Sequence, residues 1–157
     1  MFKVGDYIIY KKDVCRIKDI NDNTYTLIPI LDDSLKIEVP INSPFLRKPI
    51  SKEEVMKIIE EMPNIPVIEE NDRMIEGTYK EYIKNGTYRD LVSVIKTTYL
   101  RNKKRKDDKK KISDRDLSYF DLAEKLLYSE FSIALNLSYD ETKEFVLEHV
   151  DKNKNSW

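Results

Sequence analysis

The chain has 157 residues, of which 40% are hydrophobic and 36% charged, so it can build one or two folded cores and is not disordered throughout. Its 28 basic and 29 acidic residues nearly cancel, and the net charge of −1 says nothing about where charge is concentrated. A single cysteine, Cys15, excludes an internal disulfide and a cysteine-rich metal site. The opening residues lack a signal-peptide core, and no stretch reaches the roughly 20 apolar residues of a membrane span, so we expect a cytoplasmic protein with no membrane partner.

The first forty residues alternate between apolar and polar positions and are rich in β-branched and aromatic residues, which predicts short strands. Turns that contain Asp or Asn at 11–13, 21–23 and 32–34 separate them. Four or five strands at this spacing predict a small, strongly bent sheet that closes on itself. Pro29 has no backbone N–H to donate, so we expect it at an edge or a bulge. The expected strands lie in VGDYIIY, VCRIKDI, TYTLIPI and LKIEVP.

Three prolines between residues 40 and 49 mark a connecting segment, after which the apolar periodicity is helical. We therefore place a domain boundary near residue 50. Ser51 with Glu54 forms a capping box that opens a first helix, and the next two prolines end it. A second helix is expected over roughly Asp72–Asn85. Gly86 follows it, as a residue suited to the left-handed position after a helix.

Three further helices are expected from their capping residues. Thr87 with Asp90 opens the third, Ser113 opens the fourth, and Ser138 with Glu141 opens the fifth. The sequence thus predicts an α+β protein with a small N-terminal β-barrel over residues 1–50, an all-α domain over 51–150 and a polar tail over 151–157. The residues expected on the buried side of the fourth helix are Leu117, Phe120, Leu126, Leu127, Phe131 and Ala134.

The sequence contains few residues suited to catalysis or to metal binding. Its single histidine, His149, lies in the last turn of the last expected helix, where the helix dipole favours a solvated imidazolium. One histidine and one cysteine cannot make a structural zinc site, and three scattered glycines form no phosphate-binding loop. We expect no enzyme activity, no cofactor, no metal and no small-molecule substrate. The alternative, an enzyme or an adaptor, predicts a deep polar pocket near Glu69, Glu70 and Asp72.

Positive charge is concentrated between Lys96 and Lys111, where nine basic residues stand with two acidic ones, a net charge of +7. Such a cluster attracts a polyanion, because each neutralised phosphate releases condensed counterions. The plainer interpretation is a solvated helix end followed by a flexible linker. We favour nucleic-acid binding because the cluster falls inside an expected folded domain. The residues expected to contact DNA are Arg73, Lys96, Arg101, Lys103, Lys104, Arg105, Lys106, Lys109, Lys110 and Lys111.

Four segments carry a resemblance to a known family. They are FKVGDYIIYKKDVCRI and LKIEVP in the expected barrel, and TYKEYIKNGTYRDLVSVIKTTYLR and DLAEKLLYSEFSIAL in the helical part. In this order, from Phe2 to about Val146, the chain resembles the bacterial CarD/CdnL transcription regulators, whose first domain is shared with the transcription-repair coupling factor. The collinearity of the four segments, more than any one of them, makes the resemblance specific.

The resemblance implies a Tudor-like barrel that binds the β subunit of RNA polymerase and a helical domain that contacts promoter DNA near the upstream edge of the transcription bubble. A protein of this kind modulates the stability of the open promoter complex and performs no chemistry. Strand edges also suit pairing with a strand of another chain. Arg101 matches a basic family position at the DNA face. The residues that match polymerase-contacting positions are Tyr25, Thr26, Ile28, Ile30, Lys36, Ile37 and Glu38.

The chain also departs from this family. Where the family commonly has a tryptophan after an asparagine at the start of the second helix, Asn71 is followed by Asp72, so the wedge at the DNA minor groove is missing. Glu38 stands at a basic family position, and the loop at 102–111 is longer and more basic. DNA contact should therefore rely on phosphate attraction. The alternative is a general nucleic-acid-binding protein whose barrel has another partner, and we expect a monomer in either case.

Overall fold

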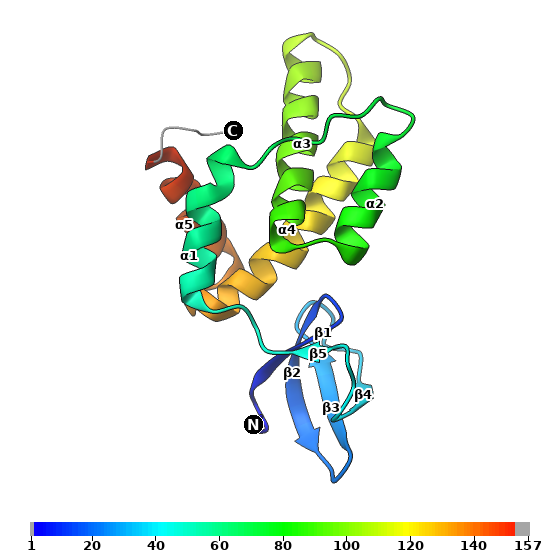
Figure 1. Cartoon of the computed structure of the whole chain (residues 1–157), viewed down its shortest axis with the longest axis vertical. Coiled ribbons are helices and arrows are strands. Elements are labelled where there is room, and N and C mark those ends of the chain that lie inside the picture. The colour runs from blue at the N-terminus through cyan, green and yellow to red at the C-terminus, as the bar shows by residue number, and fades with distance from the viewer. Residues whose placement is uncertain (1, 153–157) are drawn as a thin grey trace. The chain divides into compact units, whose positions relative to one another are not determined.

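The chain divides into two units, one that ends at Ser51 and one that begins at Lys52. Figure 1 shows the computed structural model, which describes residues 2–152. The first unit consists of strands and the second of helices, so the protein is α+β with its strands before its helices. Within the described residues, none of the helices is long and apolar enough to cross a membrane.

The first unit is a five-stranded antiparallel sheet that curls into a half-barrel. Its strand order is β4-β3-β2-β1-β5, so β4 and β5 are the two edges and the sheet does not close. The expectation of a closed barrel was therefore wrong, because the last strand has only two residues and pairs with β1 alone. The strands are β1 (Tyr7–Tyr10), β2 (Asp13–Ile20), β3 (Thr24–Pro29), β4 (Ile37–Pro40) and β5 (Leu46–Arg47).

One face of the curled sheet holds the hydrophobic core of the first unit. Opposed pairs such as Ile8 with Cys15 and Ile17 with Leu27 are fully buried, as the alternating sequence predicted. Burying an aliphatic side chain of this size contributes about 1.5–3 kcal/mol. Burial also raises the pKa of the Cys15 thiol to about 11, so the thiol stays uncharged at neutral pH.

Pro29 lies at the end of β3, an interior strand of the sheet. The pairing of β3 with β4 ends at Leu27, and the backbone N–H of Ile30 donates to Val14 of β2 at 3.0 Å. Because N–H groups alternate in direction along a strand, the nitrogen of Pro29 faces the side on which β4 has already ended. The proline thus occupies a local edge, where its missing N–H costs no ladder bond.

The described part of the second unit contains five α-helices and one short 3₁₀ turn. The helices α3 and α4 form its largest contact, α2 packs on α3, and α1 packs on α4 and α5. Leu127 and Phe131 of α4 are fully buried, as predicted. The elements are α1 (Lys52–Glu61), η1 (Met62–Asn64), α2 (Ile75–Asn85), α3 (Tyr88–Asp107), α4 (Asp114–Leu135) and α5 (Tyr139–Lys152).

Capping residues determine where the last three helices begin, as predicted from the sequence. The Thr87 hydroxyl accepts from the Asp90 N–H at 3.2 Å, while the Asp90 carboxylate accepts from the Thr87 N–H at 3.0 Å. Ser138 and Glu141 make the same reciprocal pair at 3.0 and 2.9 Å, and Ser113 caps α4 through its hydroxyl. Each pair satisfies backbone donors that the first helical turn leaves unbonded. A cap of this kind stabilises a helix by about 1 kcal/mol.

Two expectations for helix ends were wrong. Gly86 does not adopt a left-handed conformation, since its φ of −83° and ψ of 172° are extended. A Cβ there would clash with the Tyr82 carbonyl and lie 2.8 Å from the Asp90 carboxylate. Glycine is therefore required because these two groups approach its Cα closely. At the other end of the unit, α5 continues to Lys152 instead of ending at Val150, and the rest of the expected polar tail, 153–157, lies outside the described residues.

Candidate nucleic-acid interface

Most of the basic segment is helical and not a loop. α3 continues to Asp107 and ends in a Schellman motif, in which the Lys110 N–H donates to the Arg105 carbonyl at 2.7 Å and Lys109 has a φ of 59°. The side-chain oxygen of Asn102 accepts from the Ser113 N–H at 2.8 Å, and its side-chain N–H₂ donates to the Ser113 carbonyl at 3.2 Å. Both ends of the short connection to α4 are therefore held in place, which argues against a flexible linker.

Seven of the predicted DNA-contacting residues form what we call the basic end. Six of these side chains are exposed and Arg105 is half-buried. None of the seven forms an ion pair with a carboxylate of the described residues. With the neighbouring Asp107 and Asp108 the basic end carries a net charge of +5. Its members are Lys103, Lys104, Arg105, Lys106, Lys109, Lys110 and Lys111.

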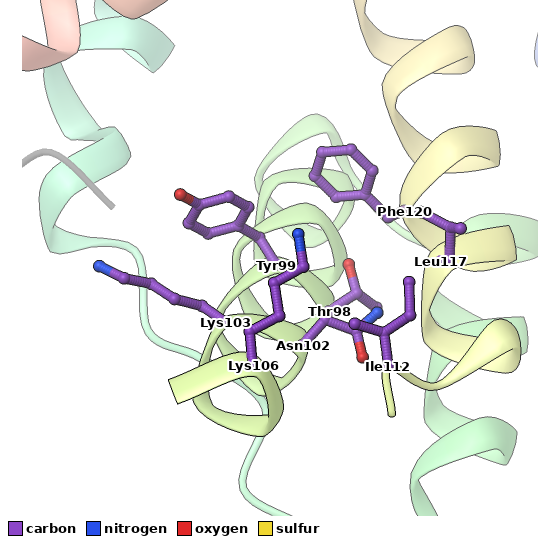
Figure 2. A pocket seen from close by; sticks show the side chains of 8 residues that line it. All are labelled: Thr98, Tyr99, Asn102, Lys103, Lys106, Ile112, Leu117 and Phe120. Carbon is purple, nitrogen blue, oxygen red and sulfur yellow. The ribbon is translucent and has the colours of Figure 1, made fainter. Parts of the chain in front are cut away.

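The helical part of the basic end presents cations on two opposite sides, because successive residues of an α-helix are separated by about 100°. On one side, Lys103 and Lys106 border a groove of about 210 Å³ between α3 and α4, which we call the α3–α4 groove. Figure 2 shows its walls, with Tyr99 on α3 and Phe120 and Leu117 on α4. On the other side lies a hollow of about 210 Å³, which we call the arginine hollow. It is lined by Arg101, Lys104, Arg105, Asp108 and Lys110.

Lys96 is not part of this surface, and its assignment as a DNA-contacting residue was wrong. Its side chain is 9% exposed and its ammonium group donates to the carbonyls of Met62, Pro63 and Ile65 at 3.1, 3.0 and 2.9 Å. Burial lowers the pKa of Lys96. The side chain thus satisfies carbonyl groups of η1 and of the residue that follows it, a structural role that its position in a run of cations does not reveal.

Arg101 is held by two carboxylates and is not a free cation, which corrects its expected role. Its Nε lies 2.9 Å from Asp116 Oδ2 and its Nη2 lies 2.6 Å from Asp72 Oδ1. Asp72 also accepts from Nη2 of Arg115 at 3.0 Å. The hydroxyl of Tyr79 donates to the fully buried Asp116 at 3.1 Å. Asp72, which stands at the sequence position where the resemblance led us to expect a tryptophan, is therefore part of an ion-pair network with Arg101 and Arg115.

The remaining predicted residue of the helical unit, Arg73, is exposed and lies in the segment before α2. Its backbone N–H and that of Met74 donate to the side chain of Asn71 at 3.1 and 3.0 Å. This turn places Asp72 beside the two arginines. α2 itself begins at Ile75, three residues later than expected, because the asparagine side chain bonds the backbone in a turn instead.

The acidic residues considered for an enzyme do not enclose a site. Glu69, Glu70 and Asp72 are all exposed, and the Glu70 carboxylate accepts from the Thr78 hydroxyl at 2.8 Å. Hydrogen bonds from Arg115 and Arg101 lower the pKa of Asp72, whereas a catalytic acid needs a raised one. Among residues 2–152, no three His, Cys, Asp or Glu side chains are placed to hold a metal ion.

The residues predicted to contact polymerase separate into an edge group and a core residue. Lys36 and Glu38 are exposed at or beside the edge strand β4, where Ile37 is half-buried. Thr26 stands opposite Glu38, Ile28 is half-buried, and Ile30 is exposed. Tyr25 is the exception, since its side chain is 7% exposed in the core and its ring packs edge-on against Phe2. It is therefore unavailable for a partner.

The apolar part of the α3–α4 groove was not predicted from the sequence. Leu117 was expected on the buried side of α4 but is 40% exposed, and Tyr99 is 39% exposed. The signal was the spacing of Tyr99, Lys103 and Lys106, which places an aromatic ring and two cations on one helical face. Comparison of the chain with protein-family models and with curated proteins gives no match.

Proposed function

We propose that this protein is a transcription regulator that binds promoter DNA through the basic end of its helical unit and the RNA polymerase β subunit through its sheet. The observation that carries the DNA half is a set of exposed cations without internal ion-pair partners at one end of α3. The resemblance to CarD/CdnL regulators supports the polymerase half, together with a Tudor-like character for the curled sheet. A general nucleic-acid-binding protein with another partner shares the same DNA surface.

The shape of the basic end supports binding to duplex DNA. In Figure 1 the C-terminal end of α3 extends past the neighbouring ends of α2 and α4. An α-helix is about 10–12 Å in diameter, and the major groove of B-DNA is about 12 Å wide. A helix end with cations on both sides can approach phosphates of both strands when it enters this groove. The division of the lysines between two faces thus suits a duplex.

The helix dipole gives a plainer reason for some of these residues. Lys104, Arg105 and Lys106 lie in the last turn of α3, where each cation stabilises the negative end of the helix by about 0.3–1 kcal/mol. The dipole does not account for Lys109–Lys111, which follow the helix, nor for Lys103 before its last turn. Binding of an external anion would account for these four cations.

The edge strand β4 supports binding of an extended segment of a protein partner. The Ile41 N–H donates to the carbonyl of Asn23, the residue before β3, at 2.9 Å. Because backbone N–H groups alternate in direction along a strand, the N–H of Glu38 points away from β3. Exposed apolar side chains, Ile30, Leu31 and Leu35, lie in the chain just before this strand. Backbone groups at an edge with apolar residues nearby are the features that strand addition uses.

The DNA half is tested by the salt dependence of binding. Replacing Lys104, Lys109, Lys110 and Lys111 by alanine should reduce the slope of log K against log salt by about 0.9 for each phosphate that is no longer neutralised. A control with the same net charge replaces four exposed lysines elsewhere, Lys57, Lys80, Lys84 and Lys125. The measurement is fluorescence anisotropy on a duplex at several salt concentrations. Equal slopes for the two variants would refute this role of the basic end.

The polymerase half is tested at Glu38 with a matched pair of variants. Glu38→Pro removes the outward N–H of β4, while Glu38→Ala removes the charge and keeps the N–H. We expect a pull-down of a polymerase β-subunit fragment to fail with the proline variant and to succeed with the alanine variant. If the wild-type chain does not bind the fragment, the partner of the sheet is a different protein.

A further inference from the structure

The walls of the α3–α4 groove are aromatic and aliphatic side chains, and two cations, Lys103 and Lys106, stand beside them. The rings of Tyr99 and Phe120 lie 6.3 Å apart between centroids with an interplanar angle of 33°. Tyr99 and Leu117 are 39% and 40% exposed, values that leave large apolar areas open beside Lys103 and Lys106. Figure 2 shows the two walls rising from different helices, with both lysine side chains extending from α3.

The polar groups at the floor of the groove are already hydrogen-bonded within the fold. The Thr98 hydroxyl donates to the Val94 carbonyl at 2.7 Å, and both side-chain atoms of Asn102 are bonded to the backbone of Ser113. A ligand in this groove is therefore held by stacking and dispersion and not by hydrogen bonds from these two residues. Such contacts do not distinguish strongly between bases.

Charge and size restrict the kind of ligand. Lys103 and Lys106 at the rim favour a group that carries negative charge beside a flat apolar part. The volume of about 210 Å³ is below the roughly 300–1,000 Å³ of sites for drug-sized molecules, so the groove suits one flat ring system. A nucleotide has this chemistry, since its base stacks on aromatic side chains while its phosphates meet lysines.

We propose that the α3–α4 groove binds an unpaired base of single-stranded nucleic acid, stacked against Tyr99 and Phe120, with the flanking phosphates on Lys103 and Lys106. This inference rests on the proposed function and deepens it. Bases inside a duplex are stacked on their neighbours and do not reach the groove. The groove therefore selects nucleic acid with unpaired positions, whereas the remaining lysines of the basic end also contact a duplex.

The test compares one sequence as a single strand and as a duplex. Tyr99→Leu keeps an apolar side chain and removes the ring, and Tyr99→Phe keeps the ring. We expect Tyr99→Leu to weaken single-strand binding by about 5- to 150-fold, the range for loss of one base stack, and to change duplex binding less than twofold. Tyr99→Phe should bind like the wild type. Fluorescence anisotropy at fixed salt measures both affinities.

Two further measurements separate stacking from charge and from folding. An abasic oligonucleotide keeps the phosphates, so the wild type should bind it more weakly than the normal strand by the same factor, while Tyr99→Leu should not distinguish them. Leu117→Glu, at a half-exposed position, places a negative charge in the groove and should weaken single-strand binding at least about tenfold. Thermal unfolding of each variant checks the fold.

The outcomes distinguish this inference from the proposed function. If Tyr99→Leu leaves single-strand binding unchanged, or weakens both forms of DNA equally, the groove is not a base site although the basic end still binds DNA. If the wild type binds neither form with a steep salt dependence, the proposed function fails and the groove inference fails with it. Specific binding of an apolar peptide in place of the oligonucleotide would assign the groove to a protein partner.

Discussion

Individual lysines of α3 have different roles although they stand in one run of cations. Lys96 is buried and donates to three carbonyls, whereas Lys104, two turns later, is exposed beside the arginine hollow. A charged donor in a buried position satisfies acceptors that water cannot reach, and removing it leaves them unbonded. A lysine in water loses little when it is replaced. Burial thus divides the structural lysine from the lysines that are accessible to an external anion.

Lys96→Met tests the structural role. We expect the free energy of unfolding to fall by about 1.5–3 kcal/mol, because a charged donor to three carbonyl oxygens is lost. Duplex binding should stay within about twofold of the wild type, since the side chain does not face solvent. Urea unfolding and fluorescence anisotropy measure the two effects. The control, Lys104→Met, should keep the stability of the wild type and weaken duplex binding. If the stability of Lys96→Met is unchanged and its duplex binding is weaker, Lys96 contacts DNA and the structural role is refuted.

Asp72 is the residue that keeps two arginines from external anions. Its Oδ1 accepts from both Arg101 and Arg115 at the surface, while the buried Asp116 holds the other side of Arg101. Asp72→Asn should free guanidinium groups for phosphate and steepen the salt slope of duplex binding by about 0.9 for each additional phosphate that they neutralise. Asp121→Asn, at an exposed position of α4, changes the net charge equally and is the control. A steeper slope in both variants would show only the effect of net charge.

At the scale of elements, the helical unit contains a buried carboxylate that joins one helix to another through a partly exposed lysine. The ammonium group of Lys143 on α5 lies 3.1 Å from Glu124 Oε1 on α4, and Glu124 is 7% exposed. Burial raises the pKa of Glu124, and Lys143 partly opposes this effect. Desolvation is the larger cause, so the charged form of this carboxyl is less stable in the folded chain than in water.

The pH dependence of stability follows from the raised pKa of Glu124. A carboxyl with a raised pKa in the folded state contributes fully to stability below its unfolded pKa of about 4.3 and loses this contribution as the pH rises through the folded pKa. The free energy of unfolding of Glu124→Gln relative to the wild type should therefore increase over this interval and then level off. Urea unfolding of both proteins at a series of pH values measures the difference. A difference that decreases with pH would mean that the attraction of Lys143 outweighs burial.

At the scale of the molecule, the two units have separate cores. Leu27 is fully buried in the sheet, and Leu127 is fully buried in the helical unit. A unit with its own core can lose stability without unfolding its neighbour. Leu27→Ala should lower amide-exchange protection by about 2–5 kcal/mol within the first unit and leave duplex binding unchanged. Loss of protection that spreads to the helices after Lys52 would show that the chain unfolds as one cooperative structure.

Much of the local structure could be predicted because its determinants are close together in the chain. The alternation around Ile8, Cys15 and Ile17 specifies strands whose side chains share the core of the sheet, and Thr87 with Asp90 specifies a helix start within four residues. In each case, the side chains satisfy or bury groups of their immediate neighbours. No distant partner is needed, so composition and spacing were sufficient.

The tertiary structure alone decided which charges and rings are available to a partner. Lys96 meets its acceptors 31–34 residues away, and Arg101 meets Asp72 29 residues away. The exposure of Leu117 likewise depends on how α4 lies against α3. The sequence does not distinguish a buried lysine or leucine from an exposed one, because burial and ion pairing are set by segments far away in the chain. The sequence by itself therefore determined the order of strands and helices and the concentration of positive charge, while packing selected which residues face solvent.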